Sequence, residues 1–288
     1  MKDRMIELGY AAGWRLVRAL PLPVAKAVFR AAADRAYKAN GRGTQRLRGN
    51  LRQVVGEGMP DTLVRDALRS YARYYMEAFR LPSQSRADFL DGFFMEPESY
   101  RQLKQSVEDG TGAVLALPHL ANWDVAGAWV AAHDWPMITV AERLKPEAVY
   151  KQFLAYREKL GMHILPLTGG ERPALEVLAE HLAKGWIVPL LGDRDLSRNG
   201  VEVEFFGGRT RMPAGPAILA IRSGAPLFAV DLWFDEQRTV SRMRRIVPPA
   251  EGPLDERVKK TTQMLADAFA AGIADHPQDW HMLQKVWL

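Results

Sequence analysis

The first part of the chain alternates apolar and polar positions with the period of a helix. The spacing predicts amphipathic helices over residues 5–19, 23–38 and 62–79, and Pro21 and Pro23 separate the first two. The region is therefore predicted to be helical up to about residue 80. The second helix carries Val24, Val28, Ala32 and Tyr37 with basic residues between them.

From about residue 111 the pattern changes to short apolar runs that alternate with helical stretches. The alternation predicts an α/β fold, in which helices flank a central, mostly parallel β-sheet. We find no repeat or linker, so residues 1–288 are expected to form one domain, with a helical part over 1–80 and an α/β core over 111–288. Side chains that follow the strands should gather at the carboxyl edge of the sheet. The predicted strands span residues 113–118, 137–140, 163–167, 186–191, 201–205, 227–233 and 241–247.

Charge is distributed unevenly between these two parts. Residues 1–52 hold twelve lysines and arginines against three acids, a balance of +9, whereas the whole chain of 288 residues carries only +5. A basic helical region on a mildly acidic body predicts an anionic partner, such as a membrane surface, a nucleic acid or a phosphorylated ligand. The alternative is that these charges coat solvated helix faces.

Several classes of protein are excluded or lose their main support. The chain has no cysteine, which excludes disulfides, thiolate metal sites and a cysteine nucleophile. It contains no G-x-S-x-G, H-E-x-x-H or P-loop motif. No apolar run reaches the ~20 residues that a membrane span needs, and the N-terminus lacks the apolar core of a signal peptide. We therefore expect a cytoplasmic chain that is not anchored by a span.

The strongest candidate chemistry follows the first predicted strand of the core. Residues 118–124 read PHLANWD, which places His119 at the end of that strand and Asp124 in the first turn of the next helix. Because the chain bends between them, the Asp124 carboxylate is expected to reach the imidazole and fix its tautomer, leaving the other ring nitrogen free to take a proton. A histidine after a strand is also a common structural feature, so the spacing alone leaves that alternative open.

A second charged cluster follows a later buried strand. Asp193 and Arg194 stand at its carboxyl end, where a parallel sheet could bring them opposite His119. Glu142 follows another strand in a charged loop, and Arg157 lies on a predicted helix. Phosphate binding and solvated charge both fit the Glu142 loop, and a surface position is the simpler interpretation of Arg157.

Longer blocks of sequence point to a family. LALPHLANWDVAG resembles the His-x4-Asp block of the bacterial lipid A late-acyltransferase family. Further blocks, among them VAERLKPEAVY, YREKLG, GDRDLSRNGVEVEFFGG and PQDWHMLQKVW, resemble one branch of it, the actinobacterial phosphatidylinositol mannoside acyltransferases. The blocks occur in order over nearly the whole chain. The resemblance is therefore far more specific than the His-x4-Asp spacing.

The resemblance implies catalytic roles for three residues. His119 matches the general base, which deprotonates an acceptor hydroxyl so that this oxygen attacks the acyl thioester directly. Asp124 matches the motif aspartate, and Asp193 matches the acid that partners the histidine. The position of Asp193 is more often glutamate in this branch. Aspartate is one methylene shorter, so its contact with His119 needs a closer backbone or a bridging water.

The remaining candidates are assigned to substrate binding. Arg157 matches the arginine of the family's Y-R-E block, Glu142 matches a glutamate near the donor thioester, and Arg194 is grouped with them. The resemblance implies transfer of a long-chain acyl group, expected to be palmitoyl, from acyl-CoA to a phosphatidylinositol mannoside. The implied acceptor is the 6-hydroxyl of the mannose on inositol carbon 2. No metal is expected, and no cofactor beyond the acyl-CoA donor.

The expected setting is the cytoplasmic face of the plasma membrane, with the basic helices bound peripherally to an anionic surface. One alternative is an acyltransferase of the same mechanism that acts on another glycolipid or a lysophospholipid. The other is a non-catalytic membrane- or nucleic-acid-binding protein. A nucleic-acid binder should interleave aromatic with basic residues, and Trp14, Phe29 and Tyr37 are too sparse for that. We therefore expect no nucleic-acid partner and make no prediction of the oligomeric state.

Overall fold

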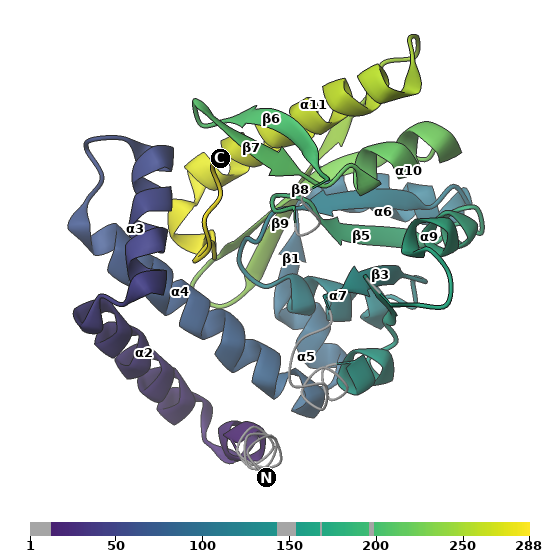
Figure 1. The fold of residues 1–288 in the computed structure, drawn as a ribbon. Helices are drawn as coiled ribbons and strands as arrows, with labels where there is room; N and C mark the ends of the chain where they lie inside the picture. Colours follow the sequence, from purple (N-terminus) through teal and green to yellow (C-terminus); the bar gives the residue numbers. More distant parts are fainter. Residues whose placement is uncertain (1–12, 143–153, 168, 196–198) are drawn as a thin grey trace.

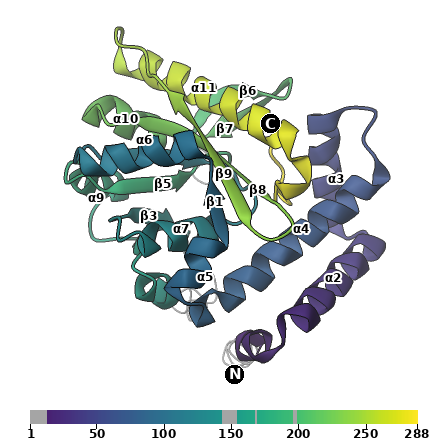
Figure 2. The same cartoon turned by 180° about the vertical axis from the view of Figure 1, so that it is seen from behind.

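The structure is a computed structural model that describes residues 13–142, 154–167, 169–195 and 199–288. Helices cover both faces of a central β-sheet, and the N-terminal helices lie along one side of it (Figure 1; Figure 2 shows the reverse side). The predicted α/β class with a mostly parallel central sheet is confirmed, and one antiparallel pair makes the sheet mixed. The first part of the helix expected over residues 5–19 lies outside the described residues, as does the beginning of the helix predicted to carry Arg157, which is expected to start at Pro146 and end near Leu160.

The N-terminal part is helical, as predicted. A helix over residues 13–19 leads into α2 (Leu22–Ala39), and α3 (Arg42–Val55) and α4 (Asp61–Arg80) follow. Pro23 stands in the first turn of α2, where its missing N–H breaks no helical hydrogen bond, and Asn40 ends that helix in the left-handed conformation. The hydrophobic pattern predicted α2 and α4 but not α3. Beyond residue 80 come η1 (Leu81–Ser83) and α5 (Arg86–Asp91).

Two valines of α2 point outward. Val24 is 44% exposed and Val28 is 51% exposed. The buried residues of this helix are the small Ala25 and Ala33, and the helix packs along α4. The periodicity located the helix, but its apolar stripe lies on the surface of the molecule rather than in the core.

The central sheet has the strand order β1-β9-β8-β2-β5. All neighbouring strands are parallel except β8 and β9, which form an antiparallel pair. β2 lies between β8 and β5 and is buried along its whole length, which explains its uninterrupted apolar sequence. The bounds are β1 (Phe93–Met95), β2 (Ala113–Leu117), β5 (Ile187–Leu191), β8 (Leu227–Phe234) and β9 (Thr239–Ile246).

Three of the predicted strands lie outside the central sheet. β3 (Ile138–Ala141) pairs in parallel with β4 (His163–Pro166), and β6 (Val201–Phe205) forms an antiparallel hairpin with β7 (Gly208–Met212). A single bridge between Met137 and Ile187 joins the β3 end to the central sheet. The alternation of strands and helices therefore predicted β3, β4 and β6, but neither β1 and β7 nor the division of the strands among three sheets.

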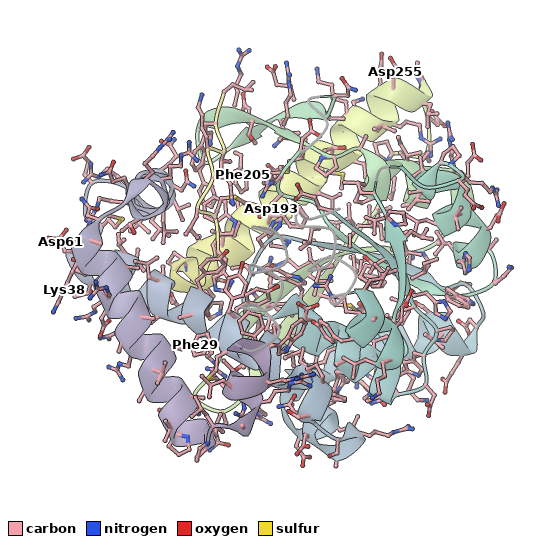
Figure 3. The ribbon with its side chains drawn as sticks, turned by 60° about the horizontal axis from the view of Figure 1, so that its bottom comes forward. Phe29, Lys38, Asp61, Asp193, Phe205 and Asp255 are labelled. Atoms are coloured by element: carbon pink, nitrogen blue, oxygen red, sulfur yellow. The ribbon has the colours of Figure 1, made fainter. Side chains whose placement is uncertain are left out.

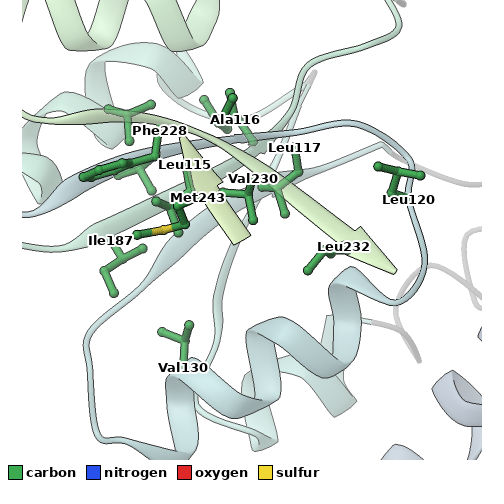
Figure 4. Packing of buried hydrophobic residues seen from close by; sticks show 14 of the residues in the cluster. Leu115, Ala116, Leu117, Leu120, Val130, Ile187, Phe228, Val230, Leu232 and Met243 are labelled. Atoms are coloured by element: carbon green, nitrogen blue, oxygen red, sulfur yellow. The ribbon is translucent and has the colours of Figure 1, made fainter. Parts of the chain in front are cut away.

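Helices cover the two faces of the central sheet. α10 (Gly215–Ser223) and α11 (Leu254–Asp275) pack on one face, and α6 (Pro97–Glu108) and α7 (Trp123–Ala132) lie on the other. α9 (Ala174–Leu182) packs near β3 and β5, and the short turn η2 (Pro277–Asp279) follows α11. On the α7 side, Leu115, Val230 and Leu232 point from the strands toward Val130 (Figure 4).

Within the described part of the chain, no helix combines the length and the apolar composition that a membrane crossing requires.

Candidate active site

His119 and Asp193 meet at the carboxyl ends of β2 and β5. Nδ1 of the His119 ring lies 2.5 Å from Oδ1 of Asp193, and the His119 backbone N–H donates to Oδ2 at 2.9 Å. His119 lies two positions after Leu117, and Asp193 lies two positions after Leu191. These two leucines are opposite each other in the strand register. The predicted contact is therefore confirmed and needs no bridging water, because adjacent strands bring the two loops together.

The protonation of this pair suits a base. Burial alone would raise the pKa of the Asp193 carboxyl, but the neighbouring His119 and the hydrogen bonds from His119 and Trp280 hold that pKa below its usual value. The ionised carboxylate accepts from Nδ1–H of the ring, so Nε2 of the neutral ring carries no proton. Among the described residues, none hydrogen-bonds to Nε2. This nitrogen can therefore accept a proton from a substrate.

The C-terminal strap, residues 279–281, holds the pair in place. The Trp280 Nε1–H donates to Oδ2 of Asp193 at 2.9 Å, and the His281 backbone N–H donates to the His119 carbonyl at 2.8 Å. Leu120 and Trp280 form an antiparallel bridge between the two segments. No local sequence pattern predicts this contribution, and its one signal in the sequence is PQDWHMLQKVW, the last of the blocks that carry the family resemblance.

A buried polar network anchors the strap to α4. The Ser70 hydroxyl donates to Oδ1 of Asp279 at 2.6 Å, and Nε2 of His281 lies 2.9 Å from the same hydroxyl oxygen. Since the hydroxyl proton is used for Asp279, Nε2 of His281 must be the donor. Burial lowers the pKa of His281 to about 3, with a smaller contribution from His119 when that ring is protonated, so the His281 ring is neutral. This histidine therefore serves as a structural hydrogen-bond donor.

Asp124 does not hold the His119 ring, so that expectation is wrong. Its Oδ1 accepts from Nε of Arg157 at 2.7 Å, and its Oδ2 accepts from Nη2 of Arg157 at 3.0 Å and from the Tyr74 hydroxyl at 3.1 Å. Asn122 caps α7 through the Val125 N–H, and the helix that starts there carries the Asp124 carboxylate away from the dyad. Asp124 and Arg157 instead form a buried bidentate ion pair.

An apolar cavity of about 260 Å³ lies between the central sheet and α7. Leu115, Val230 and Leu232 line it from the sheet, and Val130 lines it from α7 (Figure 4). Trp123 also lines the cavity, and its indole ring makes an edge contact with the His119 ring, with centroids 5.4 Å apart. An apolar cavity beside a histidine whose Nε2 can accept a proton suits a substrate with a long hydrocarbon chain.

Charged residues lie where this cavity meets the carboxyl ends of the strands. Glu142, Asp124 and Arg157 all line the cavity. Oε2 of Glu142 also lies 3.7 Å from Nη2 of Arg194. This ion pair joins the segment after β3 to the segment after β5. Arg194 lines a second cavity of about 150 Å³ next to Asp193. The structure thus places all six predicted site residues around the ends of these strands or in the cavity beside them.

The second cavity has charges of both signs in its lining. Arg194, Arg211 and Lys285 line it together with two acids, Asp193 and Asp195. The three cationic side chains are of the kind that bind phosphate or carboxylate groups. Among the described residues, no group of three or more histidine, aspartate or glutamate side chains comes together as a metal site would require.

Comparison with known proteins identifies relatives of the chain. Residues 2–288 match the sequence model of the family described as bacterial lipid A biosynthesis acyltransferase. A phosphatidylinositol mannoside acyltransferase from Mycolicibacterium smegmatis is 50% identical, with an alignment that covers 99% of this chain and 92% of the relative. A protein of the same description from Mycobacterium tuberculosis is 46% identical, covering 97% of this chain and 87% of the relative.

Proposed function

This chain belongs to the bacterial lipid A biosynthesis acyltransferase family, and we propose that it transfers a long-chain acyl group to a phosphatidylinositol mannoside. The observation that carries the proposal is the direct contact between His119 and Asp193 beside an apolar cavity. The relatives at 50% and 46% identity, both described as phosphatidylinositol mannoside acyltransferases, support the acceptor.

The proposed reaction is direct acyl transfer from acyl-CoA. Nε2 of His119 takes the proton of the acceptor hydroxyl while that oxygen attacks the thioester carbonyl. The tetrahedral adduct then collapses, the C–S bond breaks, and the imidazolium returns the proton to the departing thiolate. Asp193 stabilises the imidazolium between these steps. The chain has no cysteine and no G-x-S-x-G serine to form an acyl-enzyme, which favours a single transfer.

The two cavities divide the substrates in this proposal. The apolar cavity receives the acyl chain, expected to be palmitoyl, with the thioester near Glu142. Arg194, together with Arg211 and Lys285, contacts phosphate groups of the bound substrates. Arg157 is already paired with Asp124, so we propose that this pair shapes the lining of the apolar cavity. The proposed acceptor oxygen is the 6-hydroxyl of the mannose on inositol carbon 2.

The proposed place of action is the cytoplasmic face of the plasma membrane. Val24 and Val28 are exposed on the outer side of α2, and the same region of the sequence carries the strongly basic balance. Outward apolar side chains flanked by lysines and arginines suit a helix that lies in the membrane interface. We therefore propose peripheral binding to an anionic bilayer.

Thiol release from palmitoyl-CoA, followed by mass spectrometry of the lipid products, tests this function. The full chain should release CoA faster when a phosphatidylinositol mannoside is present and should add one acyl group to it. His119→Ala should lower this rate ~10²–10⁴-fold, the usual contribution of a general base. Acylation of a lysophospholipid in place of the mannoside would support the alternative acceptor. Near-wild-type turnover by a folded His119→Ala variant would rule out His119 as the general base.

A further inference from the structure

A cationic groove runs between α2 and α4, away from the acyl-transfer site. Its cavity measures about 260 Å³. α4 contributes to both places: the Tyr74 hydroxyl reaches Asp124 in the site, whereas Arg69 and Arg73 line the groove. The groove is lined by Lys26, Phe29, Arg30, Arg69, Arg73 and Met76.

Two of its four cations are already paired and fixed in position. Arg69 makes a two-pronged contact with Asp34, with Nε and Nη2 at 2.6 and 2.8 Å from the two carboxylate oxygens. Arg73 donates to Glu77 at 2.7 Å and to the Asp235 carbonyl at 2.6 Å. These bonds fix the two guanidinium groups in the groove and balance their charges.

Lys26 and Arg30 are not balanced in this way. Within the described part of the chain, no carboxylate lies at ion-pair distance from either side chain, and both are exposed. They stand one helical turn apart on α2, so their side chains share the α4-facing border of that helix. Lys26 and Arg30 therefore bring two positive charges to the groove that no ion pair among the described residues neutralises, although Asp34, whose pKa is lowered first by its hydrogen bond with Arg69, is close enough to Arg30 for that charge to lower it further.

The base of the groove is apolar. Met76 is buried, and the half-buried Phe29 ring packs edge-on against Phe79, with centroids 6.4 Å apart. Figure 3 shows Phe29 on the inner side of α2 and Lys38 at the outer edge of the molecule. A hydrated inorganic anion gains no binding energy from an apolar groove floor. A phospholipid does, because the carbons of its glycerol and acyl chains lie next to its phosphate.

We propose that the α2–α4 groove binds the phosphate of an anionic membrane phospholipid. Lys26 and Arg30 bind its oxygens through charge-assisted hydrogen bonds, and Phe29 and Met76 contact the carbons next to the phosphate. The proposal deepens the membrane association put forward above and rests on it. It adds a defined headgroup site to a general attraction between a basic helix and an anionic surface.

Two double variants of α2 distinguish a defined headgroup site from general electrostatic attraction to the membrane. K26Q/R30Q removes the unbalanced groove cations, and R35Q/K38Q removes two exposed cations outside the groove. Both lose the same charge, so general attraction predicts equal losses of binding, about fivefold for each cation near an anionic surface. Binding of the full chain is measured by co-sedimentation with phosphatidylcholine vesicles that contain phosphatidylinositol, and with phosphatidylcholine alone.

We expect K26Q/R30Q to lose at least about fivefold more affinity for the anionic vesicles than R35Q/K38Q, and K26R/R30K to retain binding. Equal losses in the two glutamine variants would overturn the headgroup site, as would equal binding of wild type to neutral and anionic vesicles. Unfolding midpoints of all variants serve as the folding control. Turnover of wild type on detergent-dispersed acceptor is measured separately, so a failed function and a failed groove give different results.

Discussion

The carboxylate of Asp193 holds His119 at two points, through the ring and through the backbone. Oδ1 accepts from Nδ1 of the ring at 2.5 Å and Oδ2 accepts from the backbone N–H at 2.9 Å. The Trp280 indole adds a third donor, also to Oδ2. One buried carboxylate therefore sets both the position of the histidine loop and the tautomer of its ring.

Asp193→Asn should inactivate the enzyme without unfolding it. An asparagine that keeps its oxygen at the Oδ2 position presents its NH₂ to Nδ1 of His119, which moves the ring proton to Nε2 and blocks the base. We expect a loss of ~10²–10⁴-fold in kcat/KM, and Asp193→Glu should retain a substantial part of the activity. Steady-state thiol release from palmitoyl-CoA measures both. An Asp193→Asn variant with wild-type turnover would show that the tautomer does not matter.

Trp280→Phe should shift the pH dependence of the reaction. The change removes the N–H donor to Oδ2 of Asp193 and retains an aromatic ring in a fully buried place. The carboxylate then presents more negative charge to His119, which favours the imidazolium. We expect a lower kcat and an acid limb of the pH–rate profile that moves to higher pH. A lower rate with an unmoved profile would assign Trp280 to packing alone.

Asp124→Asn should destabilise the fold. The change removes the carboxylate charge that pairs with Arg157, and the two side chains are only 3% and 17% exposed. Breaking a buried ion pair by neutralising one partner costs ~3–5 kcal/mol in the free energy of unfolding. Urea unfolding measures the difference from wild type.

Asp134→Asn is the matched control for that change. It breaks the pair of Asp134 with Arg86, whose side chains are 74% and 60% exposed, and should cost at most ~1 kcal/mol. If both variants unfold at the same urea concentration, the Asp124–Arg157 pair does not stabilise the fold.

His281 should make the protein less stable in acid. Its pKa is lowered from 6.5 to about 3 by burial, so between these values the unfolded chain binds a proton that the folded chain does not. The resulting stability is complete above pH 6.5 and is lost as the pH falls toward 3, at up to about 1.4 kcal/mol per pH unit. His281→Gln, which keeps a donor for Ser70, should flatten this dependence. Urea unfolding at several pH values tests it, and parallel curves for the two proteins would contradict it.

Local patterns in the sequence were sufficient for most elements of the core. The run Ala113–Leu117 is apolar at every position because β2 is buried on both faces. The helical spacing of apolar residues also predicts α2 and α4. It does not predict α3, because only Leu47 and Leu51 supply large buried apolar groups in a stretch rich in arginine and glycine. Burial of part of one face is a weak signal when polar residues fill the rest of the helix.

The sequence by itself determined that His119 follows a buried strand, that an acid follows another strand, and that the chain resembles one acyltransferase family. It did not determine which acid meets the histidine. Asp124 is five residues from His119 along the chain and Asp193 is 74 residues away, yet only Asp193 bonds to the ring. The parallel register of β2 and β5 decided this, because it aligns the residues that follow each strand, whereas α7 directs Asp124 toward Arg157. Trp280 reaches Asp193 through the packing of the C-terminal strap against the loop after β2. Contacts of this kind between distant segments are not encoded in any local sequence pattern.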